Sequence, residues 1–409
     1  MKKIYLLIAM ASVLSFACTE INDFKPENKQ TGPIVLSVEL QKRVAQDNEF
    51  ALDLLKQTIS KVDQSNVFIS PLSVSIALGM AWNGAEGSTR TEMETALKMS
   101  GMSIENINEY YKIMLKSLPT VDSSTTLKIA NSIWYRNGFQ IKQPFLDINK
   151  AYFEAGIRSL DFSATWAVDT INGWCAQKTN NLVKNVLTEI PDNAMMYLIN
   201  AVYFKGLWTI PFEKKGTYLT NFTNELGQKS EVNMMSKIDT FSYCSDSYAQ
   251  YLDLPYGNKD FSMTVILPAS GKTTSDVLDY LTTERLKNAI KNLQLQEVLV
   301  NLPRFKAECS YELNDPLKAM GMKNAFDDTA DFSKISDEAL SISAVIHKTY
   351  VEVTEEGTEA AAVTIIEIIT TSMPDYPAFV VNKPFLFLIR EKGTGVILFA
   401  GKMGAVEKY

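Results

Sequence analysis

An apolar run near the end of the chain, GTEAAAVTIIEIITTS at residues 357–372, places the strongest restriction on the fold. If the run is a strand, its side chains alternate between two faces. Glu359 and Glu367 then share one face, and the other face is uncharged and starts with small side chains. That face holds Thr358, Ala360, Ala362, Thr364, Ile366 and Ile368. This pattern is typical of a strand that enters the middle of a sheet over a packed core.

The residues that follow the run indicate a different environment. Pro374 and Pro377, in the segment SMPDYP, prevent regular pairing in a sheet. We therefore expect the run to end in an exposed loop. The local pattern alone is compatible with two interpretations: the run is a permanent core strand, or it is an exposed, aggregation-prone segment.

Size and charge restrict the functional class. The chain has 409 residues, 46% of them hydrophobic, which allows a large core in one big domain or two ordinary ones. Its formal net charge is −7, and no run of clustered Lys or Arg occurs. We therefore expect no nucleic acid, no heparin-like cofactor and no anionic membrane surface as a partner.

The N-terminal residues have the pattern of a targeting signal. Residues 1–17 combine a basic start, a short apolar core and a small-residue exit, which predicts a signal peptide of the lipoprotein type. Cys18 follows Ala17 as in a bacterial lipobox, so its thiol is the expected acylation site, for example for palmitate. Residues 18–36 are polar and form the lipidated tether. We expect a protein anchored to the bacterial outer membrane through the lipid on Cys18 alone, facing the periplasm or the outside; plain secretion is the alternative.

The rest of the chain, residues 37–409, shows no further linker. Helical spacing predicts helices over residues 38–59, 73–82, 179–187 and 278–293. Strand patterns cover residues 195–204, 261–267, 297–302, 384–390 and 395–400. A glycine-containing turn separates the last two, which predicts a hairpin. Helices that come mostly before long strands favour an α+β domain with a large mixed sheet.

Few residues are suited to catalysis. His347 is the only histidine, and it lies in VIHKTYVEV, an alternating strand pattern, so we expect a hydrogen-bonded core residue. Cys175, Cys244 and Cys309 show no C-x-x-C spacing, which argues against a disulfide framework or a zinc site and favours buried free thiols. No phosphate-binding glycine motif occurs. A carboxylate pair for glycoside hydrolysis stays open, although nothing in the sequence supports it. We expect no metal and no cofactor.

A set of motifs resembles one known family. The segment VIHKTYVEVTEEGTEAAAVT at residues 345–364 resembles the hinge signature of the serpins, the serine protease inhibitor superfamily. Other serpin-like motifs follow one another in the expected order: NVFISPLS (66–73), WNGAEGSTRTEM (82–93), LKIANS (127–132), INGW (171–174), LINAVYFKGLW (198–208), LPRF (302–305), NKPF (382–385) and FAGK (399–402). The resemblance covers the chain from about residue 37 to its end.

The resemblance implies a serpin fold and a suicide-substrate mechanism, in which the protein is a substrate and not an enzyme. The expected fold is one monomeric domain with three β-sheets, eight to nine helices and an exposed reactive-centre loop at about residues 355–378. A serine protease would cleave the loop and form an acyl-enzyme, and the loop would then insert into a five-stranded sheet and distort the protease. Small hinge residues would keep this insertion fast. A non-inhibitory storage, structural or binding role, or inhibition of a cysteine protease, is the alternative.

The resemblance also assigns site residues. The hinge is expected at Glu355, Gly357, Thr358, Ala360, Ala362 and Thr364. The shutter, the point beneath the sheet where strands part, corresponds to Ser70, Ser73, Asn200 and His347. The breach, where insertion starts, corresponds to Trp208 with an expected ion pair between Arg304 and Glu355, although serpins commonly have Lys at the position of Arg304.

The cleaved bond follows from counting along the loop. In serpins it lies about fourteen residues past the hinge glycine, which gives Thr371-Ser372, with Thr370 as the next candidate. No Lys or Arg lies between Thr349 and Asn382, which argues against trypsin-like targets. Thr371 is small and β-branched, so the expected partner is an elastase-like serine protease held in a covalent complex.

Overall fold

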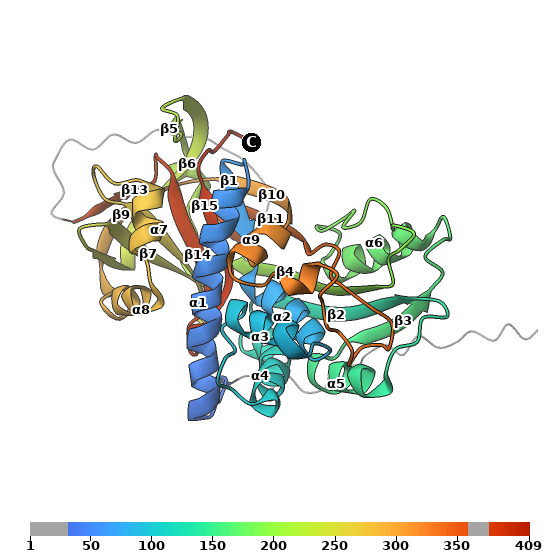
Figure 1. Cartoon of the computed structure of the whole chain (residues 1–409). Helices are drawn as coiled ribbons and strands as arrows, with labels where there is room; N and C mark the ends of the chain where they lie inside the picture. The colour runs from blue at the N-terminus through green and yellow to red at the C-terminus, as the bar shows by residue number, and fades with distance from the viewer. Residues whose placement is uncertain (1–31, 359–375) are drawn as a thin grey trace, which may run out of the picture.

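The computed structural model describes residues 32–358 and 376–409 (Figure 1). The predictions for the signal peptide and for Cys18, Ala360, Ala362, Thr364, Thr370, Thr371 and Ser372 lie outside these residues. The described residues hold nine α-helices and fifteen strands, in agreement with the predicted α+β class.

The first helices form one side of the molecule. α1 (Val38–Lys61) confirms the predicted helix over 38–59, and Ser37 caps it by accepting from the backbone N–H of Leu40. α2 (Pro71–Trp82) starts two residues before the predicted bound, because Ser70 caps it and Pro71 suits the first helical position. α3 (Gly87–Ala96), α4 (Ile104–Ser117) and α5 (Gln143–Phe153) cluster around α2 (Figure 1).

The helix predicted over residues 179–187 was wrong. The helix of this region is α6 (Ala167–Lys178), and the chain beyond it forms turns. The Thr179 hydroxyl donates to the carbonyl of Cys175, and three asparagines then adopt positive φ angles, which end helical geometry: Asn180, Asn181 and Asn185.

The predicted helix over residues 278–293 is two helices. α7 (Thr274–Tyr280) and α8 (Thr283–Lys291) are separated because Thr282 accepts from the backbone N–H of Arg285 and so caps the second helix. α9 (Asn314–Ala319) and three 3₁₀ turns, at Leu118–Thr120, Lys214–Gly216 and Asn324–Phe326, complete the helical segments of the described chain.

The first sheet has the strand order β10-β11-β12-β4-β2-β3. Its strands are β10 (Phe305–Glu312), β11 (Ile346–Thr354), β12 (Gly357–Thr358), β4 (Met196–Leu207), β2 (Thr126–Arg136) and β3 (Gly156–Leu160). β2 and β3 are parallel, and the other pairs are antiparallel. β12 is only two residues long, so this is a five-stranded sheet into which the beginning of a sixth strand has entered.

The second sheet has the order β1-β15-β14-β8-β7-β6-β9-β13, with β5 paired to β6. Its strands are β1 (Asn66–Ile69), β5 (Tyr218–Thr223), β6 (Lys229–Ser245), β7 (Ala249–Tyr256), β8 (Phe261–Pro268), β9 (Gln294–Pro303), β13 (Ala378–Val380), β14 (Phe385–Glu391) and β15 (Ile397–Met403). The antiparallel pair β14–β15 confirms the predicted hairpin.

Hydrogen bonding joins the described strands into two sheets, whereas three were predicted. The long strand β6 pairs with β5 and β9 along most of its length and with β7 at its end, through residues 242–245. What was expected as a third sheet is therefore continuous with the second through β6.

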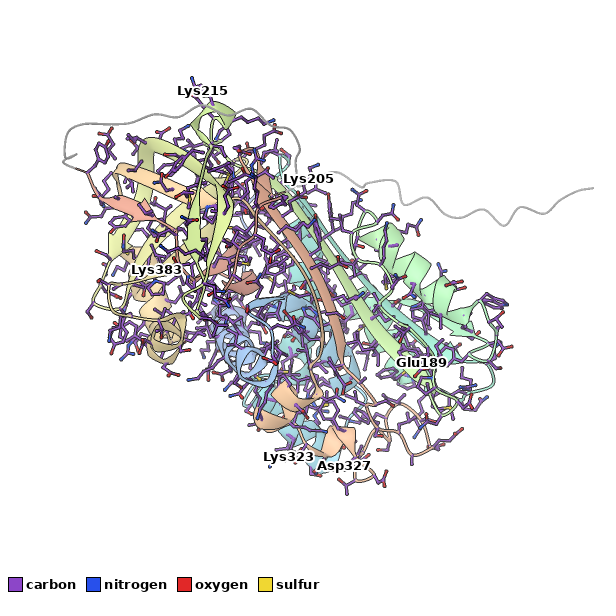
Figure 2. The ribbon with its side chains drawn as sticks, turned by 90° about the horizontal axis from the view of Figure 1, so that it is seen from above. Glu189, Lys205, Lys215, Lys323, Asp327 and Lys383 are labelled. Carbon is purple, nitrogen blue, oxygen red and sulfur yellow. The ribbon has the colours of Figure 1, made fainter. Side chains whose placement is uncertain are left out.

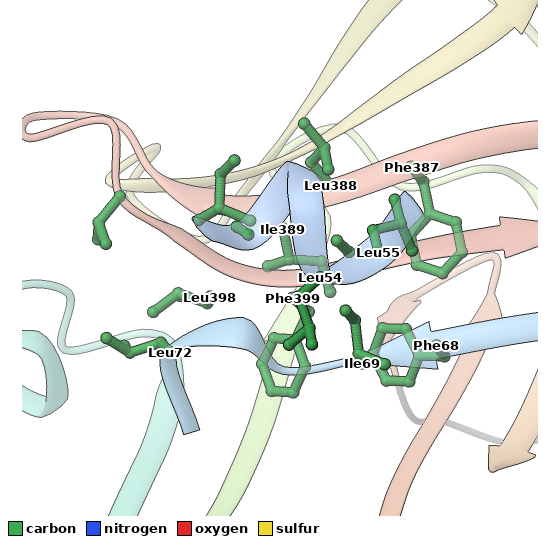
Figure 3. Packing of buried hydrophobic residues seen from close by; sticks show 14 of the residues in the cluster. Leu54, Leu55, Phe68, Ile69, Leu72, Phe387, Leu388, Ile389, Leu398 and Phe399 are labelled. Carbon is green, nitrogen blue, oxygen red and sulfur yellow. The ribbon is translucent and has the colours of Figure 1, made fainter. Parts of the chain in front are cut away.

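The core lies between α1, α2 and the second sheet. Figure 3 shows Leu54 and Leu55 of α1 packed near Leu388 of β14, and the ring of Phe68 stacks on that of Phe399 at 5.3 Å between centroids. A second, smaller cluster lies under α6, where Ile171 packs with Trp134 and Ile199 of the first sheet. α6 therefore covers the outer face of β2 and β4.

Within the described residues, no helix is long and apolar enough to cross a membrane.

The three described cysteines are free thiols. Cys175 and Cys309 are buried, as expected, and Cys244 is half-buried. Burial raises the pKa of Cys175 to about 12, so this thiol stays protonated and unreactive at neutral pH.

Candidate functional site

The site lies in the first sheet, where β12 separates β11 from β4. β12 pairs with β11 through Thr354–Gly357 and Val353–Thr358, and with β4 through Gly357–Leu207 and Thr358–Gly206. Beyond these pairs, neither β11 nor β4 has another ladder on its inner edge within the described part of the chain. The two edges face each other and run in the same direction, and β12 runs opposite to both.

A cavity of about 770 Å³ lies between these two edges, a size typical of sites that hold a ligand. Figure 2 shows the long strands of this sheet from above. Consecutive residues of the two strand edges line the cavity, 196–204 from β4 and 346–352 from β11, so side chains on both faces of the sheet reach it. Several residues between 179 and 189 and the segment 338–345 also line it.

Two hydrogen bonds from Trp208 to backbone carbonyls hold the turn that leads into β12. The indole Nε1 of Trp208 donates to the carbonyl of Thr354 at 2.9 Å, and the backbone N–H of Trp208 donates to the carbonyl of Glu356 at 2.8 Å. Gly357 has a φ of +145°, and a Cβ there would lie 2.2 Å from the carbonyl oxygen of Gly206. Only glycine fits at this position, because the backbone of β4 comes so close.

A buried ion pair fixes the same turn. Arg304 donates through Nε and Nη2 to the carboxylate of Glu355, at 2.8 and 2.6 Å, so the expected pair is present. The hydroxyl of Thr217 donates to the same carboxylate oxygen. Glu355 is 1% exposed. Because an unpaired buried charge is costly, this network strongly favours one position of the turn.

The first inward side chain of the hinge lies in the core. Thr358 is 4% exposed, and its hydroxyl forms a 2.8 Å hydrogen bond with the hydroxyl of Tyr256. The ring of Tyr256 stacks on Trp208 at 4.4 Å between centroids. Burial raises the pKa of Tyr256, so its hydroxyl keeps its proton. Trp208 and Thr358 are thus joined through a residue that the sequence did not single out.

The four residues assigned to the shutter lie at the side of the cavity next to the start of α2. The backbone N–H of Ser70 donates to Nε2 of His347 at 2.9 Å, and the backbone N–H of Ser73 donates to the hydroxyl of Ser70. The hydroxyl of Ser73 donates to Asn200, whose amide donates to Oδ1 of Asn131 at 2.6 Å. A hydrogen-bonded chain therefore connects β11, the start of α2, β4 and β2.

His347 is neutral at physiological pH. It is 6% exposed, and burial lowers its pKa to about 4. Its Nε2 accepts a hydrogen bond, which places the proton on Nδ1. Because the partner of this imidazole is a backbone amide rather than a hydroxyl or thiol, the geometry is that of a structural histidine and not of a catalytic base.

Sequence reasoning missed three residues of this site: Asn131, Thr217 and Tyr256. Asn131 lies in the LKIANS segment, so the motif offered a signal. Tyr256 and Thr217 carried none, because their partners Thr358 and Glu355 are 102 and 138 residues away in the sequence.

Comparisons with known proteins agree with this geometry. The family model described as serpin (serine protease inhibitor) matches residues 45–405. Iripin-8 of Ixodes ricinus is 36% identical over 88% of this chain and 92% of its own length, and human serpin B4 is 33% identical over 88% and 98%. The crystal structure of tengpin, a thermophilic serpin, in its native state is 34% identical, has a TM-score of 0.82, and covers 92% of this chain and 96% of its own. The chain therefore belongs to the serpin family.

Proposed function

We propose that this serpin inhibits serine endopeptidases as a suicide substrate. One observation carries the proposal: β12 pairs on both sides at the entrance of a cavity that lies between two strand edges. Such edges pair readily with an added strand. The family description, serine protease inhibitor, supports inhibition rather than catalysis.

The proposed reaction starts at the bond Thr371-Ser372. The serine hydroxyl of the protease attacks the carbonyl carbon of Thr371, the peptide bond breaks, and the proton passes to the leaving amine of Ser372. Thr371 stays bound to the protease as an ester. The released chain then extends β12 between β11 and β4 and draws the protease along before water hydrolyses the ester.

The observed register of β12 supports a specific inserted state. Thr358 lies opposite Val353 and Gly206, and antiparallel pairing advances one residue on each strand at every step. Continuing this register places Ala360 opposite Val351 and Phe204, Ala362 opposite Thr349 and Val202, and Thr364 opposite His347 and Asn200. The inward side chains that enter first, Ala360 and Ala362, are therefore small. Thr364, the next polar side chain on this face after Thr358, lies opposite His347 and Asn200 of the shutter.

The proposed target is an elastase-like enzyme. The loop offers no Lys or Arg, and Thr371 suits a shallow specificity pocket. We expect such a protease to form an SDS-stable complex and to release a fragment that starts at Ser372, which intact mass measures. A fragment that starts at Thr371 would move the bond to Thr370-Thr371. Complete cleavage without a complex would contradict inhibition and favour the non-inhibitory role, and a complex with a papain-like protease alone would indicate the cysteine protease alternative.

We also propose that the protein is a lipoprotein of the bacterial cell envelope. The lipobox-like cysteine and the polar tether over residues 18–36 support this proposal. After expression in a bacterial host, the wild type should enter the detergent phase and the Cys18→Ala variant should not. Equal partition of both into the aqueous phase would favour secretion.

A further inference from the structure

Tyr409 contacts the part of β11 with which the hinge pairs. Its hydroxyl donates to the carbonyl of Val353 at 3.0 Å and to that of Phe305 at 3.3 Å. Val353 and Phe305 are opposite each other in the β10–β11 ladder, and Val353 is also the partner of Thr358. One hydroxyl thus binds both strands at the residue pair next to β12.

The segment that carries Tyr409 is fixed to the second sheet. The hydroxyl of Ser230 donates to the carbonyl of Val406, and Nδ2 of Asn233 donates to the backbone oxygen of Tyr409 at 3.0 Å. Both partners belong to β6. Figure 1 shows this end of the chain near β6 and β10. The hydroxyl therefore links β11 to a sheet that does not take part in insertion.

The hydroxyl is suited to act as a permanent donor. Burial and the neighbouring carboxylate of Glu352 raise the pKa of Tyr409, so the proton that it donates is retained at neutral pH. Although 40% of the residue is exposed, the contact is specific because two carbonyls of different strands accept from one O–H group. Phenylalanine would keep the ring and lose both bonds.

We propose that Tyr409 is a positioning residue for the inhibitory reaction. It holds the Val353 end of β11 in place, and β11 is one of the two edges with which the inserting strand would pair. This inference rests on the proposed function. Insertion competes with hydrolysis of the ester, so a less ordered edge at the first pairing step slows insertion and releases more cleaved inhibitor. Tyr409→Phe changes no residue of the loop that the protease would bind, so we expect the attack on the reactive bond to be unchanged.

The test compares Tyr409→Phe with Lys408→Ala. The second variant removes the neighbouring ion pair with Glu231, which is solvent-exposed and contributes little to holding the segment, and it keeps the hydroxyl. An elastase-like protease is titrated with each variant, and the ratio of cleaved inhibitor to covalent complex is measured on gels together with the rate at which intact inhibitor disappears. Loss of about one net hydrogen bond should raise this ratio roughly two- to fivefold in Tyr409→Phe. Lys408→Ala should match the wild type, and the disappearance rate should be the same in all three.

Hydrogen exchange separates this inference from the proposed function. In Tyr409→Phe, the amides of residues 351–354 should exchange faster than in the wild type and in Lys408→Ala. Unchanged exchange, a wild-type ratio of products, or equal shifts in both variants would overturn the role of Tyr409. If the wild type forms no complex with any serine protease, the proposed function and the role in inhibition fail, and the exchange result alone decides whether Tyr409 orders β11.

Discussion

At the scale of single residues, the chain of contacts from His347 to Asn131 determines how the two edges of the cavity are connected. His347 lies on β11 and Asn200 on β4, and both contact residues at the start of α2 rather than each other. The edges are thus linked through the Ser70 and Ser73 region. Separation of β11 from β4 therefore requires these few hydrogen bonds to rearrange.

This arrangement predicts a pH dependence of stability. Burial lowers the pKa of His347 to about 4 in the folded protein, whereas a histidine in an unfolded chain titrates near 6.5. Between these values the unfolded state binds more protons than the folded state. The contribution of His347 to the free energy of unfolding is therefore fully present above about pH 6.5 and is lost as the pH drops toward 4. The loss at pH 5 should be about 2 kcal/mol.

Denaturant unfolding at pH 7 and pH 5 measures this loss, and His347→Gln is the control because its amide can accept from Ser70 without titrating. An equal decrease in His347→Gln and in the wild type would assign the effect to carboxylates instead.

The environment of a single residue was predictable where the residues around it form a local pattern. Its hydrogen-bond partners from other parts of the chain were not. The position of His347 in an alternating strand follows from the pattern around it. The role of Tyr256 depends on a contact with Thr358 across the fold, and no spacing in the sequence indicates that contact. Glu355 and Arg304 were matched through the family resemblance, since periodicity does not pair residues 51 positions apart.

At the scale of elements, segments with strong local signals were predicted well. The β14–β15 hairpin was predicted from two strand patterns and a glycine-containing turn, and helix α1 was predicted from helical spacing. The helix predicted over residues 179–187 was wrong, because three asparagines with positive φ angles end the helical geometry although the apolar spacing continues. β6 was not predicted either; it pairs with its neighbours in the chain, β5 and β7, and also with the more distant β9.

The two-residue strand β12 gives the second prediction. Replacing Thr358 with Arg would bury a charge beside Tyr256, and such a charge has no partner there. We expect β12 to leave the sheet and the variant to become a substrate, with a complex yield at least tenfold below that of the wild type. The matched control is Leu207→Arg, which places the same charge on an exposed residue of the neighbouring strand. Wild-type complex yield in Thr358→Arg would contradict insertion through β12.

At the scale of the whole molecule, the fold places the two-residue strand β12 between β11 and β4, where a longer strand could pair with both, inside a well-packed domain. The family resemblance supplied this architecture, whereas the sequence pattern alone left open whether the apolar run was a core strand or an exposed segment. The difference between two and three sheets has a similar origin, since it depends on how β6 is shared. Neither property is local, so neither can be read from a window of sequence.

The cavity between β4 and β11 predicts a large effect of loop cleavage on stability. If the released chain extends β12, it fills a volume of about 770 Å³ and completes ladders on two strand edges. Burial of the apolar side chains Ile366 and Ile368 contributes about 1.5–3 kcal/mol each, so together with the added ladders we expect a rise of at least roughly 5 °C in melting temperature for a domain of this size. Differential scanning calorimetry of the uncut protein and of protein cut at Thr371-Ser372 measures the difference. Thr358→Arg cut at the same bond should show a much smaller rise, because the buried charge opposes entry of the strand. Equal melting of the cut and uncut wild type would mean that the chain after Thr358 does not enter the sheet.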